Sequence, residues 1–211
     1  MTGRGTGRRV RGLDAAQRRE QRRSDLISAA LTLFAERGFL HVSIEELCQT
    51  AFVGTKSFYE LFDNKEQCYL ALFEGLAARL LGDMAEAQSR FGADNDRLIA
   101  AFVHRLTEDP RVPSVLFRRS TAVSPAVEAA RRANRRSAAT LVVDAWSAAD
   151  PPESFGVAEL TSVALGFVGG MFELITDWLH EHDPSVPADV TRLVEDLTRF
   201  HATVRRGLDT P

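Results

Sequence analysis

The sequence has few cysteines and no long run of apolar residues. It contains two cysteines, Cys48 and Cys68, too few for a disulfide framework or a four-cysteine zinc site and typical of a reducing compartment. Its longest weakly polar stretch, residues 163–172, is about half of the ~20 residues that a membrane-spanning helix needs. The N-terminus has no apolar segment of the kind that secretory signals carry. We therefore expect a cytoplasmic protein that does not contact a membrane.

Motifs of common enzymes are also missing. The sequence contains no phosphate-binding loop, glycine-rich dinucleotide turn, nucleophile elbow or HExxH motif. Asp177, His180 and His182 are ligand-type residues, but side chains two residues apart diverge on a helix and no third partner follows at metal spacing. The remaining histidines are isolated in the sequence: His41, His104 and His201. We expect no enzymatic activity, no cofactor and no metal site.

The charge of the chain is unevenly distributed. Residues 1–23 contain eight arginines and two acidic residues, a local charge of +6, whereas the whole chain of 211 residues carries −3. A basic arm on an acidic body is common in proteins that bind nucleic acids, because arginine neutralises phosphates and releases counterions. A solubilising tail has the same composition, so the arm alone does not decide between the two interpretations.

Apolar residues recur with a period of about 3.6 along the chain, and no segment alternates with a period of two. This pattern predicts an all-α fold of nine helices. The first helix carries the apolar stripe of residues 26–34 and ends at Gly38, and Asn64 caps a long fourth helix. The other helices are expected at about residues 43–50, 55–61, 94–108, 115–122, 124–148, 157–180 and 188–206.

A change in composition near residue 68 divides the chain. We expect a flexible basic arm over residues 1–17, a DNA-binding domain over residues 18–68, and a larger helical domain over residues 69–211. Three short helices joined by tight turns after a basic arm are what a helix-turn-helix requires. The third helix, residues 55–61, would then enter the major groove.

Residues 23–73 contain the segments ALTLFAERGF, SIEEL, SFYELFDNKEQ and YLALF. In these segments and their spacing the chain resembles the DNA-binding domain of TetR-type transcriptional regulators. The resemblance implies that Thr55 and Lys56 read bases, and that other residues contact the DNA backbone. These backbone contacts are Ser43, Ser57, Tyr59 and Lys65. We add Arg22 and Arg23, at the end of the basic arm, to the expected DNA contacts.

Two positions depart from the usual TetR-type pattern. Phe52 stands in the turn between the second and third helices, where the family usually has glycine. A bulky residue with positive φ is an outlier, so this turn is either reshaped or strained. Leu61 stands where the family often has histidine or a similar polar residue, which removes one expected backbone contact.

The resemblance further implies that a long fourth helix leads to a ligand-binding and dimerisation domain, and that the chain is a repressor released from a palindromic operator by a small molecule. We expect the last two helices to form the interface of a homodimer, since they carry small and apolar residues at helical spacing. The expected interface residues are Val163, Phe167, Gly170, Leu193, Leu197, Phe200 and Val204. Packing within one chain would give the same pattern.

Apolar residues on the helices of the larger domain are candidates for a pocket that takes a small hydrophobic ligand. They are Phe102, Leu106, Phe117, Leu141, Trp146, Phe167, Met171 and Phe172. Plain core packing explains the same spacing. The arginine pairs at residues 118–119, 131–132 and 135–136 suit either an anionic ligand or a solvated face, with Glu128 paired to Arg132.

Two other functions remain open from the sequence. A helical protein that coats DNA without sequence preference would also carry the basic arm, and it would bind all duplexes equally at fixed salt. A regulator that senses oxidants would use Cys48 or Cys68, because a thiol in a DNA-binding domain can couple oxidation to release of DNA.

Overall fold

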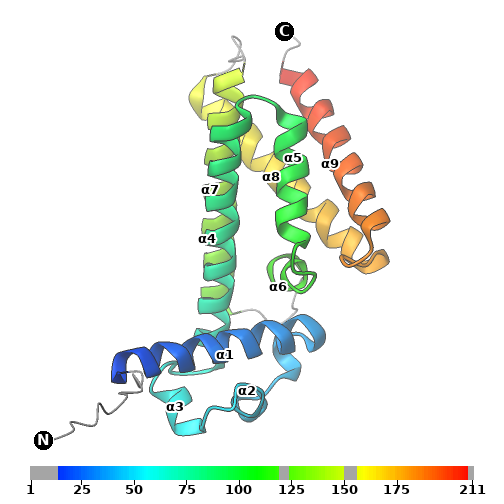
Figure 1. The fold of residues 1–211 in the computed structure, drawn as a ribbon. Coiled ribbons are helices and arrows are strands. Elements are labelled where there is room, and N and C mark those ends of the chain that lie inside the picture. The colour runs from blue at the N-terminus through cyan, green and yellow to red at the C-terminus, as the bar shows by residue number, and fades with distance from the viewer. Residues whose placement is uncertain (1–13, 119–123, 150–155, 209–211) are drawn as a thin grey trace, which may run out of the picture.

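The described part of the chain is helical throughout. A computed structural model describes residues 14–118, 124–149 and 156–208, and within these ranges no strand occurs. Nine α-helices and one 3-10 turn follow one another there (Figure 1), which confirms the expected all-α class. Their bounds in chain order are α1 Ala15–Arg37, η1 Phe39–His41, α2 Ile44–Thr50, α3 Thr55–Tyr59, α4 Lys65–Phe91, α5 Asn95–Thr107, α6 Val112–Phe117, α7 Pro125–Ala149, α8 Val157–Glu181 and α9 Pro187–Leu208.

Capping residues fix the ends of the N-terminal helices. Asp14 forms a capping box with Gln17 at the start of α1, so residues 15–17, expected as part of a flexible arm, are the first turn of a helix. Gly38 ends α1 with a φ of 77°, a conformation that glycine adopts without steric cost. Asn64 accepts a hydrogen bond from the main chain of Gln67 and starts α4 as expected.

Two predicted helix ends differ from the structure. The sixth helix begins at Val112 rather than Val115, because the main-chain amide of Val112 bonds to Asp109 and Pro113 falls in the first turn, where its missing N–H costs nothing. The predicted end of this helix, at residue 122, lies outside the described residues. The third helix ends at Tyr59, two residues earlier than expected.

The helices form two connected parts (Figure 1). α1, α2 and α3 lie together at one end of the molecule, with α1 across the base of α4. α4 rises from them and packs with α5 and α7, while α8 and α9 complete the larger part. α6 lies at the lower edge of the larger part and packs against α1, α4, α5 and α8. α4 and α6 therefore connect the two parts.

A single cluster of buried apolar side chains runs through both parts. Phe58 of α3, Phe73 of α4 and Trp146 of α7 are among its largest fully buried members. Each contributes roughly 1.5–3 kcal/mol by removing apolar surface from water. Because this buried cluster is continuous, contacting side chains connect a change in packing at one end of the molecule to the other end.

Candidate DNA interface and ligand cavity

The turn between α2 and α3 is a Schellman motif, the hydrogen-bonded end common in helices that stop at a left-handed residue. The main-chain amide of Val53 bonds to the carbonyl of Cys48 across 2.9 Å, and that of Phe52 bonds to Gln49 across 3.2 Å. Phe52 is the left-handed residue, with a φ of 55°. A non-glycine residue costs roughly 1–2 kcal/mol in this conformation, so the turn keeps its geometry at the expense of strain.

α3 presents polar side chains outward and buries its aromatic face. Thr55, Lys56 and Tyr59 are exposed and Ser57 is half-buried. Phe58 and, just beyond the helix, Phe62 are four residues apart and both are buried in the core. Leu61, which stands at an expected polar position, is half-buried and packs against the same core. The structure therefore brings the four expected contact residues of this helix to one outward surface.

Lys65, expected to contact phosphate, is also used within the chain. Its ammonium donates to the carbonyls of Phe39 and Val42, at 2.9 and 2.7 Å, and lies 4.5 Å from the centre of the Phe39 ring. Partial burial lowers the pKa of Lys65, and the charge of Glu46 opposes that shift. The side chain thus ties the start of α4 to the segment that precedes α2. An ammonium has three donors, so one remains for a phosphate.

Ser43 lies at the N-terminus of α2 in a reciprocal capping box. Its hydroxyl accepts from the main chain of Glu46, whose carboxylate accepts from the main-chain amide of Ser43 across 2.8 Å. The Glu46 carboxylate also forms an ion pair with Arg37 at 2.6 Å. These hydrogen bonds, those from Ser43 first, lower the pKa of Glu46 to about 2. Ser43 is therefore held in place by the box.

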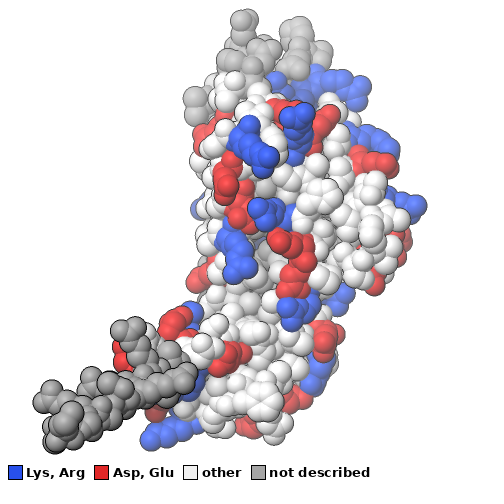
Figure 2. All heavy atoms as spheres, in the orientation of Figure 1, with Lys and Arg blue, Asp and Glu red and all other residues white. Residues whose placement is uncertain are grey.

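The arginines of α1 lie beside the end of α3. Arg19 donates to the main-chain carbonyl of Glu60 across 3.0 Å, and the Arg23 guanidinium lies 5.6 Å from the centre of the Phe62 ring. Arg22 and Arg23 are both half-buried. Where grey atoms leave it visible, the end of the molecule that holds α2 shows uncharged surface with scattered basic and acidic side chains in Figure 2. Residues 1–13 of the expected arm lie outside the described residues.

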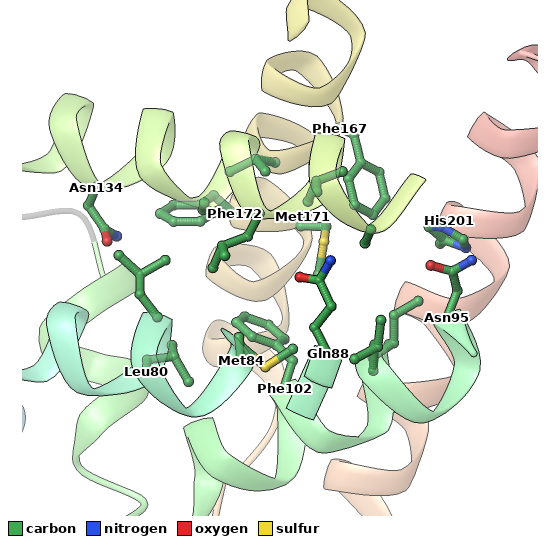
Figure 3. Close-up of a pocket in the computed structure, with 18 of the residues that line it drawn as sticks. Leu80, Met84, Gln88, Asn95, Phe102, Asn134, Phe167, Met171, Phe172 and His201 are labelled. Atoms are coloured by element: carbon green, nitrogen blue, oxygen red, sulfur yellow. The ribbon is translucent and has the colours of Figure 1, made fainter. Parts of the chain in front are cut away.

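A cavity lies in the larger part between α4, α5, α6, α7, α8 and α9 (Figure 3). Its empty volume, including the open mouth, is about 960 Å³. Seven of the eight expected pocket residues line it, and Leu106 does not, because it is fully buried in the core. Leu80, Leu81 and Met84 of α4 line it as well. Their helical spacing was visible in the sequence, but only the packing shows which side of α4 faces a cavity.

The cavity has few polar atoms and, among its lining residues, no charged side chain. Its polar side chains are Gln88, Asn95, Asn134 and His201. Asn134 lies at the opposite end of the view in Figure 3 from Asn95 and His201, and its buried Oδ1 has no hydrogen-bond partner. Nε2 of His201 accepts a hydrogen bond from the Trp146 indole across 3.1 Å. Burial, assisted by Arg205, lowers the pKa of His201.

The described arginines of the pairs expected as an alternative anion site are not among the residues that line the cavity. Arg135 forms an ion pair with Glu128 at 3.1 Å, in place of the pairing of Arg132 that the sequence suggested. Arg131 donates to the carbonyl of Arg118. Arg119 lies outside the described residues.

The expected dimer residues are all buried or half-buried within the chain. Phe167, Leu193 and Leu197 are 4%, 1% and 0% exposed, so their side chains pack within one chain and the expectation that they contact a partner is corrected. Gly170 also has a partner inside the chain, since an added Cβ would lie 2.6 Å from the ring of Phe200. The other two, Val163 and Val204, are half-buried.

A different face of α8 is open. Leu165 and Leu174 are 41% and 38% exposed, Gly166 is exposed and Gly169 is half-buried. By length and composition this helix, over Ala158–Glu181, is apolar enough to cross a membrane, although its weakly polar stretch over residues 163–172 is too short by itself. α8 packs along α7 and also touches α6 and α9, so part of its apolar surface lies in the core and part is exposed.

Both cysteines are buried. Burial raises the pKa of Cys68 to about 12 and also raises that of Cys48, against a hydrogen bond with Thr55. A thiol that stays protonated at neutral pH reacts slowly with oxidants, which disfavours the redox-sensing alternative. Within the described residues, no three metal-ligating side chains come together.

The chain has a helix-turn-helix at one end and a separate helical part with a cavity. This arrangement is typical of DNA-binding transcriptional regulators. Residues 26–72 match the family described as "Bacterial regulatory proteins, tetR family". The match covers the DNA-binding end of the chain, and it confirms the resemblance of that segment to TetR-type regulators.

Similar proteins include both activators and repressors. The HTH-type transcriptional activator FasR of Mycolicibacterium smegmatis is 24% identical over 185 residues, which cover 86% of this chain and 82% of that protein. FadR from Bacillus subtilis, solved in complex with stearoyl-CoA, shares the fold with a TM-score of 0.64 at 18% identity, over 82% of this chain and 96% of the other. SmeT, the repressor of the Stenotrophomonas maltophilia efflux pump SmeDEF, also has a TM-score of 0.64, at 19% identity over 86% and 89% of the two chains.

Proposed function

We propose that this chain binds a palindromic double-stranded DNA operator as a homodimer in the cytoplasm, and that an apolar small molecule in the cavity releases it. The observation that supports this proposal most directly is the position of α6. Leu116 and Phe117 of this helix line the cavity, and the carbonyl of Val115 accepts a hydrogen bond from Tyr69 of α4. α6 also packs against α1. A ligand that displaces α6 therefore acts on two helices that hold the DNA-binding end.

In this proposal α3 lies in the major groove. Thr55 and Lys56 read bases, because they are exposed at the N-terminal end of the recognition helix. The backbone contacts are Ser43, Ser57, Tyr59, Lys65, Arg22 and Arg23. Phosphate contacts fix the register and base contacts set the sequence preference, so Thr55 and Lys56 determine which operator is bound.

The proposed dimer uses the open face of α8. On this face Leu165 and Gly166 are exposed and Gly169 is half-buried, so they form a strip of small and apolar residues, with the exposed Leu174 at the opposite edge of the face. A second copy of the same strip would bury it by two-fold symmetry. Two recognition helices related in this way can meet half-sites about one DNA turn apart.

The proposed ligand is a long hydrocarbon chain. The lining is almost wholly apolar and has no charged side chain, and a charged group buried without a partner costs several kcal/mol. Any ionised head group must then remain at the mouth. The FadR relative was solved with stearoyl-CoA, a molecule with this division between chain and head, and we take it as the probe.

Repression is the proposed effect on transcription. A dimer that occupies an operator blocks a promoter without further contacts, whereas activation needs an additional surface for the polymerase. In vitro transcription from a promoter that overlaps the selected operator tests this, and a rise in transcript on adding the protein would assign activation instead, as in the relative FasR.

The central experiment is in vitro selection of a duplex followed by fluorescence anisotropy at fixed salt. We expect a palindrome bound at least about 1,000-fold more tightly than random DNA, and weaker binding when stearoyl-CoA is added but not when free CoA is added. Ala138→Phe, which fills the cavity, should abolish this response. Ala133→Phe, an exposed site on the same helix, is its control.

The alternative of a DNA-coating protein predicts equal affinity for all duplexes. Lys56→Ala separates the two functions. In a sequence-specific regulator this change weakens operator binding more than binding to random DNA. Equal losses on both duplexes would favour the coating protein.

A further inference from the structure

Phe52 is the most exposed large apolar side chain in the described part of the chain. It is 97% exposed, whereas the others of this kind lie between 38% and 55%. It lies in the turn between α2 and α3, three residues before Thr55. In Figure 1 this turn is at the end of the molecule farthest from α8 and α9.

The fold of the turn does not require a phenylalanine. The Schellman hydrogen bonds need a left-handed residue at this position, and glycine adopts that conformation without strain. The buried apolar contact of the motif comes from Val53, which lies next to Phe52 and is in the core. The ring of Phe52 thus adds strain and apolar exposure with almost no contact inside the chain.

We propose that the Phe52 ring contacts the C5-methyl group of a thymine in the major groove of the operator. This inference rests on the proposed function. Residues at the N-terminal end of a recognition helix lie nearest the base edges, and Phe52 is three residues before that end. A phenyl ring has no hydrogen-bonding atom, and the thymine methyl is the apolar group that base pairs present in the major groove.

The surroundings favour DNA as the occupant of this site. Phe52 is exposed, and so are Thr55, Lys56 and Tyr59, three of the expected contact residues, which follow it by three to seven positions. α3 carries the exposed cation Lys56, which attracts the phosphates on either side of the groove. The ring then makes a fifth contact beside the four of α3 and adds to the specificity of the operator.

The test combines protein and DNA changes that remove only the contact. The variants are Phe52→Gly, which removes the ring and the strain, and Phe52→Ala, which removes the ring and keeps the left-handed strain. Each thymine of the selected operator is replaced in turn by deoxyuridine, which lacks only the methyl group. Val186→Ala, an exposed apolar site in the larger part, is the control variant.

We expect one deoxyuridine position per half-site to weaken wild-type binding about fourfold, the factor for one buried methylene-sized group. Both Phe52 variants should lose at least as much on the unmodified operator and nothing further at that position, while Phe52→Gly unfolds at the same or a higher temperature than wild type. Val186→Ala should behave as wild type.

Two results would overturn the contact. In one, Phe52→Gly binds the operator as tightly as wild type. In the other, both Phe52 variants lose affinity but no deoxyuridine position distinguishes them from wild type, which assigns the ring to the DNA backbone or to another partner. Failure of the proposed function has a different signature, since the wild-type chain would then select no palindrome at all.

Discussion

The Tyr69 hydroxyl donates a hydrogen bond to the main-chain carbonyl of Val115 across 3.2 Å. Tyr69 belongs to α4, and its ring meets Phe34 of α1 edge-on with centres 5.4 Å apart. Val115 belongs to α6, next to the cavity residues Leu116 and Phe117. One side chain thus contacts all three helices through which a change in the cavity would reach the DNA-binding end.

Tyr69→Phe should weaken the response to ligand without abolishing DNA binding. The ring and its packing remain, and only the hydrogen bond to α6 is lost. Couplings between sites are typically 1–3 kcal/mol, so we expect the ratio of operator affinities without and with stearoyl-CoA to fall about threefold or more. Anisotropy titrations measure both affinities. A variant with the full wild-type ratio would show that this hydrogen bond does not carry the coupling.

Gly170→Ala should destabilise the chain, whereas Gly169→Ala should not. A Cβ at Gly170 would lie 2.6 Å from the Phe200 ring, but one at Gly169 would meet no atom within 4 Å. Overpacking costs about 1–3 kcal/mol, while replacing an unconstrained helical glycine by alanine gains roughly 0.5–1 kcal/mol. Urea unfolding at several protein concentrations separates these effects from association. Equal shifts for the two variants would contradict the packing argument.

The residues that start and end several of the helices could be identified from the sequence alone. Ser43 and Asn64 carry side chains that cap helices, and both start the predicted ones. Gly38 ends α1 with positive φ. The positive φ at Phe52 could be anticipated because a turn at that place needs a left-handed residue. Such features depend on a few neighbouring residues, so a single sequence contains them.

Which apolar residues face a core, a cavity or a partner could not be predicted in the same way. Leu106 and Phe102 are four residues apart on α5, yet only Phe102 lines the cavity. Leu193 and Leu197 have the spacing of an interface, yet both are buried within the chain. Periodicity identifies the apolar face of a helix, but the packing of other helices decides what covers it. Tertiary contacts carry that information.

His201→Gln should remove part of the loss of stability between neutral and mildly acidic pH. Burial lowers the pKa of His201 below its usual 6.5, with Arg205 acting in the same direction and Asp96 opposing it. The unfolded chain therefore binds the proton more readily, so this stabilisation is complete above about pH 6.5 and is lost as the pH falls through the folded-state pKa. Glutamine keeps a neutral acceptor for the Trp146 indole.

Urea unfolding at a series of pH values from 7.5 to 5 measures the difference, and we expect a shallower decline for His201→Gln. The other histidines are present in both proteins, so their contributions cancel in the comparison. Parallel declines for the two proteins would mean that His201 takes up its proton equally in the folded and unfolded chains.

Glu46→Gln should make the chain less stable at neutral pH, and this difference should shrink in acid. Hydrogen bonds from Ser43 and Arg37 lower the pKa of Glu46 to about 2, so the folded chain holds the carboxylate ionised where the unfolded chain protonates it. The stabilisation is therefore complete above about pH 4.5 and is lost as the pH falls toward 2. Glu45→Gln, exposed in the same helical turn, is the matched control for charge near the start of α2. The measurement is the free energy of unfolding at pH 7, 4.5 and 3. As the pH falls, the value for Glu46→Gln should approach that of wild type more than the value for Glu45→Gln does. Equal behaviour of the two variants would assign the effect to the helix dipole rather than to the capping box.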